Sequence, residues 1–279
     1  MSTLTGVRTP VPVPPRPGAS GVVATARLRA EHNGSTTTLP LLSGDGPFHL
    51  QRLRPRGAAA RVDIIGAMSG PLGGDRLALH ADVGPRARLD VTAAASTIAL
   101  RGPVEDAATY DIRLTVGDGA TLRWLPQPLI STAGSSLHQT CTVDLAPTAR
   151  LVLRDEAVLG RTGETSGNLT SRLAVRRAGR PLLDQHGAYG NHHPGWDGPA
   201  VVGTYRACGQ LLVVDPSFAR QDPTPVLLGD PGDPGARAQG VLVPLAGPAL
   251  LATAVADTAT RLRDLLDEAL RRALPSQSA

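Results

Sequence analysis

The sequence predicts a mostly β fold, and three observations lead to this prediction. Polar and apolar residues alternate with a period of two in several segments, which is the pattern of strands that bury one face. The turns that follow some of these segments repeat one arrangement of residues. Finally, the 279 residues include 31 glycines and 25 prolines but only 3% aromatic residues, a composition that argues against a long helical bundle.

The alternation identifies individual strands. It is clearest at residues 23–28, 87–91, 111–116 and 141–145. Successive residues of a strand point to opposite sides, so each segment would have one buried and one hydrated face. Cys141 is in phase with the apolar residues of its segment, and we expect it to point into the core as a small hydrophobic side chain.

Three turns share one pattern. Residues 82–89, 115–122 and 144–151 each contain a strand end, a turn of small residues and then Ala-x-Leu at the start of the next strand. The final leucines recur about every 30 residues, and a unit of that length is too short to enclose its own core. One interpretation is a winding of stacked units, as in a β-solenoid. The other is three hairpins in a β-sandwich, and the pattern alone favours neither.

The chain is long enough for one large domain or two small ones. Residues 1–20 contain five prolines and little to bury, so we expect a flexible Pro-rich leader followed by a single domain over residues 21–279. Residues 229–235, which are rich in Gly, Asp and Pro, are expected to form a loop.

The domain is expected to end in a helix at about residues 250–273, a segment without Pro or Gly. Apolar side chains recur on one face of this segment: Leu251, Val255, Leu262, Leu265, Leu266, Ala269 and Leu270. Asp267 with Arg271, and Glu268 with Arg272, have the spacing of ion pairs along the outer side of a helix.

The charged residues exclude several classes of function. The chain contains no lysine, so it has neither a phosphate-binding G-x-x-x-x-G-K-[ST] loop nor a Schiff-base lysine. The net charge is +4, but the arginines are spread along the chain, and we expect no nucleic-acid partner. Two cysteines, no apolar signal core and prolines within the apolar residues 241–256 predict a cytoplasmic protein without a membrane span.

Known catalytic motifs are missing, because the sequence contains neither G-x-S-x-G nor H-E-x-x-H. The sequence therefore offers no known catalytic motif. His186, His192 and His193 lie close together in sequence and, with Cys208, are weak candidates for metal ligands. A hydrated polar loop is the alternative interpretation of these histidines.

Asp155 is an acid in the apolar phase of its strand. It alternates with Leu151, Leu153 and Leu159, so a regular strand would turn its carboxylate toward the core. A buried carboxylate requires a partner, and the sequence allows a supporting arginine (Arg161 or Arg172) or a wet internal passage. The alternative is a bulge or strand end that lets Asp155 reach water.

Three segments resemble the urease accessory protein UreD (UreH) family. They are G-P-L-G-G-D-R-L at residues 70–77, L-R-W-L-P-Q at 122–127 and V-L-G-R-T-G-E at 158–164, in the family's order and with the interleaved turns. The resemblance covers about residues 21–185. It departs from the family at residues 97–102, where this chain lacks a lysine, a tyrosine and a serine that relatives commonly carry.

The resemblance implies a fold of two stacked sheets with β-solenoid-like winding and one or more C-terminal helices. It implies a protein that is not an enzyme but a urease maturation chaperone, which binds apo-urease and, with UreF and UreG, helps deliver nickel through a polar internal passage. Nickel would be in transit, with no permanently bound cofactor. Asp75 and Glu164 match the family's motifs, and with Asp155 they are the candidates for the metal passage.

Two alternatives stay open at this point. The chain could be a structural adaptor without a metal path. It could also be a β-solenoid enzyme that uses Asp75 and Glu164 as an acid–base pair on a carbohydrate. The sequence leaves open whether the chain forms a homodimer.

Overall fold

The computed structural model describes residues 21–220, 224–229 and 235–275. The expected Pro-rich leader, residues 1–20, lies outside the described residues, as does most of the expected loop at 229–235.

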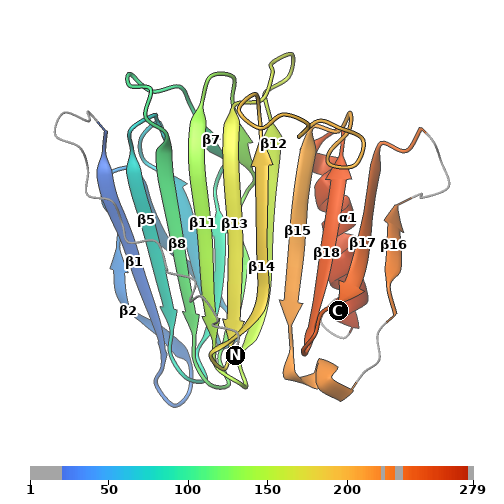
Figure 1. Cartoon of the computed structure of the whole chain (residues 1–279). Helices are drawn as coiled ribbons and strands as arrows, with labels where there is room; N and C mark the ends of the chain where they lie inside the picture. The colour runs from blue at the N-terminus through green and yellow to red at the C-terminus, as the bar shows by residue number, and fades with distance from the viewer. Residues whose placement is uncertain (1–20, 221–223, 230–234, 276–279) are drawn as a thin grey trace, which may run out of the picture.

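Two large β-sheets face each other across a common core (Figure 1). The first sheet has seven strands in the order β14 (Arg180–Tyr189), β13 (Asn168–Arg177), β11 (Ser136–Leu145), β8 (Ala108–Val116), β5 (Arg76–Val83), β1 (Val23–His32) and β2 (Thr37–Ser43). The second sheet runs β16 (Val226–Gly229), β17 (Ala238–Pro244), β18 (Ala249–Ala256), β15 (Ala207–Val214), β12 (Arg150–Leu159), β9 (Thr121–Leu125), β6 (Arg88–Ala93), β4 (Ala59–Gly66) and β3 (Phe48–Arg56), with the short β10 (Leu129–Ser131) and β7 (Thr97–Ala99) beside it. The four strands expected from alternation lie within β1, β6, β8 and β11 or overlap them.

The three repeated turns join the two sheets. They connect β5 to β6, β8 to β9 and β11 to β12, and each turn bonds to the one before it. The Gly117 N–H donates to the Val83 carbonyl at 2.8 Å, and the Ala146 N–H donates to the Val116 carbonyl at 2.9 Å. Strands β5, β8 and β11 pair in parallel, as do β6, β9 and β12. Stacked winding is therefore confirmed, because hairpins would pair antiparallel.

The repeated leucines form a row inside this winding. Leu122 pairs in register with Leu89 on one side and Leu151 on the other, and each side chain is 0–1% exposed. Cys141 is also buried in this core, as expected. Each turn of the chain thus contributes the same apolar residue to the space between the sheets.

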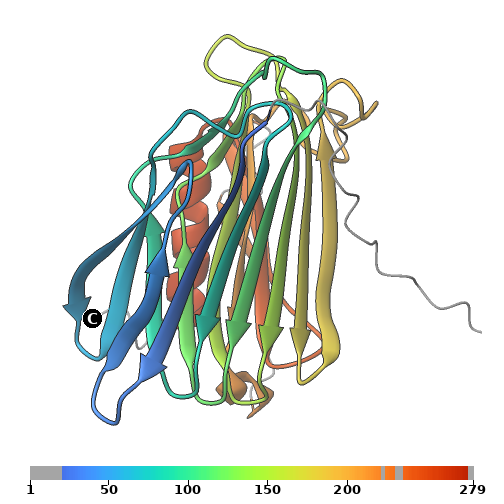
Figure 2. The same ribbon diagram turned by 90° about the vertical axis from the view of Figure 1, so that its left-hand side faces the viewer.

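Among the described residues there is one α-helix, α1 (Ala259–Ala273), which covers the outer face of the second sheet over β12, β15, β17 and β18 (Figure 2). A short 3-10 helix (Pro216–Arg220) follows β15. The buried face of α1 includes the predicted residues Leu262, Leu265, Leu266 and Ala269. Within the described residues, no helix has the length and apolar character needed to cross a membrane.

The predicted helix was too long at its N-terminal end. Residues 249–256 form strand β18, which is buried on both faces: Leu251 packs into the core between the sheets, whereas Leu250 and Ala252 pack toward α1. An apolar run buried on both faces has no periodicity that separates strand from helix. The actual start of the helix is the cap residue Thr258, whose side chain accepts a hydrogen bond from the Arg261 N–H.

Leu122→Ala should lower the free energy of unfolding by about 2–5 kcal/mol, because it leaves a cavity in the central leucine row. Denaturant unfolding measures this loss. The control is Leu41→Ala, which truncates a side chain that is 41% exposed on β2 and should change stability by less than about 1 kcal/mol. Equal losses in the two variants would contradict the central role of the leucine row.

Candidate functional site

Three cavities bear on the candidate site, and the two larger ones reach the surface, because exposed side chains belong to their linings. Cavity 1, about 440 Å³, opens between β13 and β14 of the first sheet and β12, β15, β17 and β18 of the second, and its lining includes Asp155, Tyr189, Cys208 and Gln210. Cavity 2 is narrow, about 50 Å³, and is lined by Asp155, Gln139 and Trp124 among others. Cavity 3, about 270 Å³, lies between the β4 and β6 ends and the loop that precedes β5.

The three cavities share walls. Asp155 lines both cavity 1 and cavity 2. Cavities 2 and 3 share Ile64, Ala93, Thr97 and Tyr110. They therefore form a series with the narrow cavity in the middle, and Asp155 stands where the widest cavity meets the narrowest. A volume of about 50 Å³ holds only a few water molecules.

Asp155 points between the sheets, as its phase predicts. Its Oδ1 accepts a hydrogen bond from Gln139 Nε2 at 3.2 Å, and its Oδ2 accepts one from Ser171 Oγ at 3.5 Å; both partners belong to the opposite sheet. Gln210 also donates to this carboxylate. The pairing of β12 with β15 has no register shift, so no bulge releases Asp155 toward water.

The surroundings of Asp155 favour its neutral form. Burial raises the pKa of the Asp155 carboxyl, and hydrogen bonds from Gln210, Gln139 and Ser171 only partly offset this effect. The amide oxygen of Gln210 is itself buried and accepts no hydrogen bond from any described residue. The junction of cavities 1 and 2 thus presents oxygen atoms with unused capacity to bind a cation or water.

The two expected arginine partners lie elsewhere. Arg161 forms a bidentate pair with Glu164, with contacts of 2.5–2.9 Å, in the turn after β12. Arg172 pairs with Asp184 at 2.7 Å on the outer face of the first sheet. The expectation of an arginine beside Asp155 is therefore corrected: its partners are neutral side chains, because both arginines point to the outside.

Asp75 and Glu164 do not line the three cavities described here. Asp75 is 3% exposed, and its two carboxylate oxygens accept hydrogen bonds from the Val22 and Leu72 N–H groups, both at 2.8 Å. This geometry fastens the start of β1 to the turn before β5. Glu164 lies in an exposed turn, where Arg161 lowers the pKa of its carboxyl. The two acids are thus engaged in separate local contacts, which does not support an acid–base pair.

The weaker metal candidates are also separated. Cys208 lines cavity 1, where burial raises the pKa of its thiol to about 12, so it is protonated at neutral pH. His186 is exposed on β14 and contributes to the same lining. His192 and His193 lie in the turn after β14. Across the described parts of the chain, no three His, Cys, Asp or Glu side chains converge as metal ligands would.

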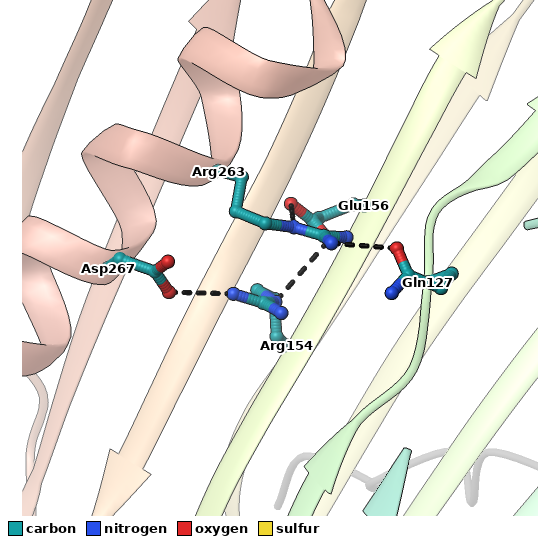
Figure 3. A network of polar contacts seen from close by, with 5 residues as sticks. All are labelled: Gln127, Arg154, Glu156, Arg263 and Asp267. Atoms are coloured by element: carbon teal, nitrogen blue, oxygen red, sulfur yellow. Dashed lines mark hydrogen bonds and ion pairs between the residues drawn. The ribbon is translucent and has the colours of Figure 1, made fainter. Parts of the chain in front are cut away.

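A charged network on the other face of β12 was not predicted. Glu156, whose side chain is 1% exposed, pairs with Arg154 at 3.3 Å and with Arg263 of α1 at 2.6 Å. Arg263 also donates to Gln127 at 2.7 Å, and Arg154 donates to Asp267 of α1 at 2.7 Å (Figure 3). Asp267 therefore bonds across to β12 instead of along the helix to Arg271, whereas the expected pair of Glu268 with Arg272 is present at 2.6 Å.

One signal in the sequence could have revealed this network. Arg154, Asp155 and Glu156 are consecutive charged residues within an otherwise apolar strand. Because their side chains alternate between faces, both faces of β12 had to be covered by other elements. The neutral partners of Asp155 gave no comparable signal, since Gln139 and Gln210 come from strands distant in sequence.

Known proteins match this chain over almost its full length. The family model described as UreD urease accessory protein matches residues 22–279. The chain is 59% identical to urease accessory protein UreD 2 of Saccharopolyspora erythraea, over 97% of this chain and 95% of that protein. It is 56% identical to urease accessory protein UreD 3 of Streptomyces griseus subsp. griseus, over 92% of this chain and 99% of that protein. It is 52% identical to urease accessory protein UreD of Streptomyces avermitilis, over 90% of this chain and 98% of that protein.

Asp155 should make the stability of the fold depend on pH. Its pKa is raised in the folded chain, so above about pH 4 the unfolded carboxyl ionises first, and stability falls as pH rises toward the folded value. The Asp155→Asn variant has no ionisable carboxyl at this position, so its stability does not fall for this reason. The free energy of unfolding of the wild type, measured against that of the variant, should decrease as the pH rises above about 4. A difference in free energy of unfolding that stays constant with pH would refute the assignment.

Glu156→Ala should lower the free energy of unfolding by about 3–5 kcal/mol, because Arg154 and Arg263 lose their shared buried carboxylate. Amide hydrogen exchange should also become faster in α1, which the network ties to β12. The control is Glu268→Ala, which removes an exposed ion pair of α1 and should change stability by less than about 1 kcal/mol. Unchanged exchange in α1 would show that apolar packing alone holds the helix.

Proposed function

Because this chain belongs to the UreD family of urease accessory proteins, we propose that it acts in urease maturation as a scaffold without turnover of its own. In this proposal it binds apo-urease and, together with UreF and UreG, helps deliver nickel to the urease active site. The nickel moves along the series of cavities that meet at Asp155. This arrangement of cavities is the observation that carries the proposal.

The chemistry of the junction suits a cation in transit. A passage must bind its ion weakly enough to release it, which favours oxygen atoms and water over a closed set of thiolate and imidazole ligands. Asp155 and the unpaired amide oxygen of Gln210 supply such oxygens. Because burial raises the pKa of Asp155, protons compete with a cation for its carboxylate at a higher pH than they would at an ordinary aspartate, and cation binding weakens as the pH falls.

The two ends of the series carry exposed apolar side chains. Val201 and Leu227, 54% and 61% exposed, line cavity 1, whereas Met68 and Ile98, 53% and 38% exposed, line cavity 3. Exposed apolar groups beside an opening are typical of protein contact sites. Partners bound at both ends would separate the passage from bulk water. This role places the chain in the cytoplasm, in keeping with its two free cysteines.

Asp155→Asn should leave the accessory complex intact and reduce the nickel content of urease several-fold. The chain would be co-expressed with the urease subunits and the other accessory proteins, and nickel per active site would be measured in purified urease. Asparagine preserves the size of the side chain but removes the carboxylate that binds the cation. The matched control, Asp144→Asn, makes the same substitution at an exposed site on β11 and should leave the nickel content unchanged.

Co-purification of the chain with its partners separates the two possible failures. Full nickel content with Asp155→Asn in an intact complex would reject the passage and leave a structural adaptor. Loss of the complex itself would instead assign Asp155 to stability, a result that the unfolding measurements above would also reveal.

A further inference from the structure

Cavity 3 has an apolar wall. None of the described residues that line it is charged, and its lining includes Met68 and Ile98, which are 53% and 38% exposed. Phe48 and Tyr110 belong to the same wall, with their ring centroids 5.7 Å apart. Its volume of about 270 Å³ is close to the lower end of the range for ligand pockets. The wall therefore suits aliphatic and proline side chains of a polypeptide.

The described chain begins beside this cavity. The Val22 N–H donates to Asp75 Oδ1 at 2.8 Å, and a Cβ atom added at Gly70 of the lining would lie 3.4 Å from Asp75 Oδ2. A Cβ atom added at Gly46, which precedes Pro47 of the lining, would lie 3.3 Å from Val22 Cγ1. The Pro-rich leader, residues 1–20, therefore joins the domain next to cavity 3.

The sequence of the leader complements the apolar wall. Its five prolines lie within residues 10–17 and alternate there with Val11 and Val13. Proline restricts the backbone before binding, so such a segment loses little conformational entropy when it docks, and aromatic-lined grooves are frequent receptors for Pro-rich segments. At about 3.3 Å per extended residue, residues 10–17 can reach about 13–36 Å from Gly21. The leader is thus long enough to cover the cavity beside which it begins.

The charges near the start of the domain also complement the leader, which contains two arginines and no acidic residue. Asp45 in the loop before β3, and Glu105 and Asp106 in the loop before β8, are exposed. Among the described residues, no cationic side chain lies within 4.0 Å of these three carboxylates. The loop before β8 accepts a hydrogen bond from the N–H of Gly74, which lies against Gly21. Arginines of the leader can therefore meet carboxylates close to the point where the leader begins.

We propose that cavity 3 is a binding site for the leader of the same chain. Proline and valine side chains of residues 10–17 pack on the apolar wall, and the arginines of the leader lie beside the exposed carboxylates. The family model begins at residue 22, so the leader lies outside the part of the chain that defines the family. The inference concerns the chain by itself and does not depend on the nickel passage. A partner that binds at this end would have to displace the leader.

Thiol labelling of the full chain tests the proposal. Met68→Cys places a thiol at cavity 3, and Leu41→Cys places a control thiol at an exposed site on β2, whereas the two native cysteines are buried. Each variant is studied with the natural leader and with Val11→Asp plus Val13→Asp, which removes apolar side chains from the leader. Mass spectrometry measures the rate of alkylation. We expect the altered leader to raise this rate at least about fivefold at position 68 and less than about twofold at position 41.

A second measurement distinguishes the leader from other occupants. Under mild oxidation, Val13→Cys combined with Met68→Cys should form a disulfide within one chain, seen as the loss of two reactive thiols at the mass of a monomer. If Met68→Cys prevents folding, Ile98→Cys supplies a thiol at the same cavity.

Three outcomes would overturn the proposal. Equal alkylation rates at position 68 with the two leaders would show that the leader does not cover cavity 3. Protection of position 68 that weakens on dilution would assign the cavity to a second copy of the chain. A disulfide that forms only between chains would lead to the same conclusion.

Discussion

The in-register stacking of parallel strands is the constraint on which the rest of the structure depends. The turns that join the sheets bond to one another, so every winding of the chain enters the second sheet at the same height. Leu89, Leu122 and Leu151 consequently occupy equivalent positions in a continuous apolar row. Any polar side chain in the inward phase of a strand is then held between the sheets and must find its partners there.

Strand β12 shows how this constraint shapes the interior. Its inward acid, Asp155, meets neutral side chains from the opposite sheet, whereas its outward Glu156 meets Arg154 of the same strand and Arg263 of α1. The same strand therefore separates two electrostatic environments. Inside, the carboxyl is biased toward its neutral form beside water-sized spaces. Outside, full charges are neutralised in a network that fastens the helix to the sheet.

This separation has consequences for a protein that serves as an accessory to an enzyme. Cavities with weakly engaged oxygen atoms suit the proposed release of an ion, because no partner there is strong enough to retain it. The charged network keeps the outer covering of β12 in place without placing a fixed cation beside Asp155. The proposed contacts with other proteins lie at the surface, at the exposed apolar residues of the outer cavities.

The strands, the repeated turns and the family membership were readable in the sequence, because each is encoded by residues that are neighbours along the chain. The inward phase of Asp155 was equally local. The division of residues 250–273 into a strand and a helix was decided by tertiary structure. A continuous apolar run is compatible with a buried helix and with a strand that is covered on both faces, and the sequence does not show which elements cover it. The sequence likewise did not determine the partners of Asp155, Glu156 and Asp267, because several of these partners come from elements far apart in the chain. Only the packing of sheet on sheet and of helix on sheet brings those side chains within bonding distance.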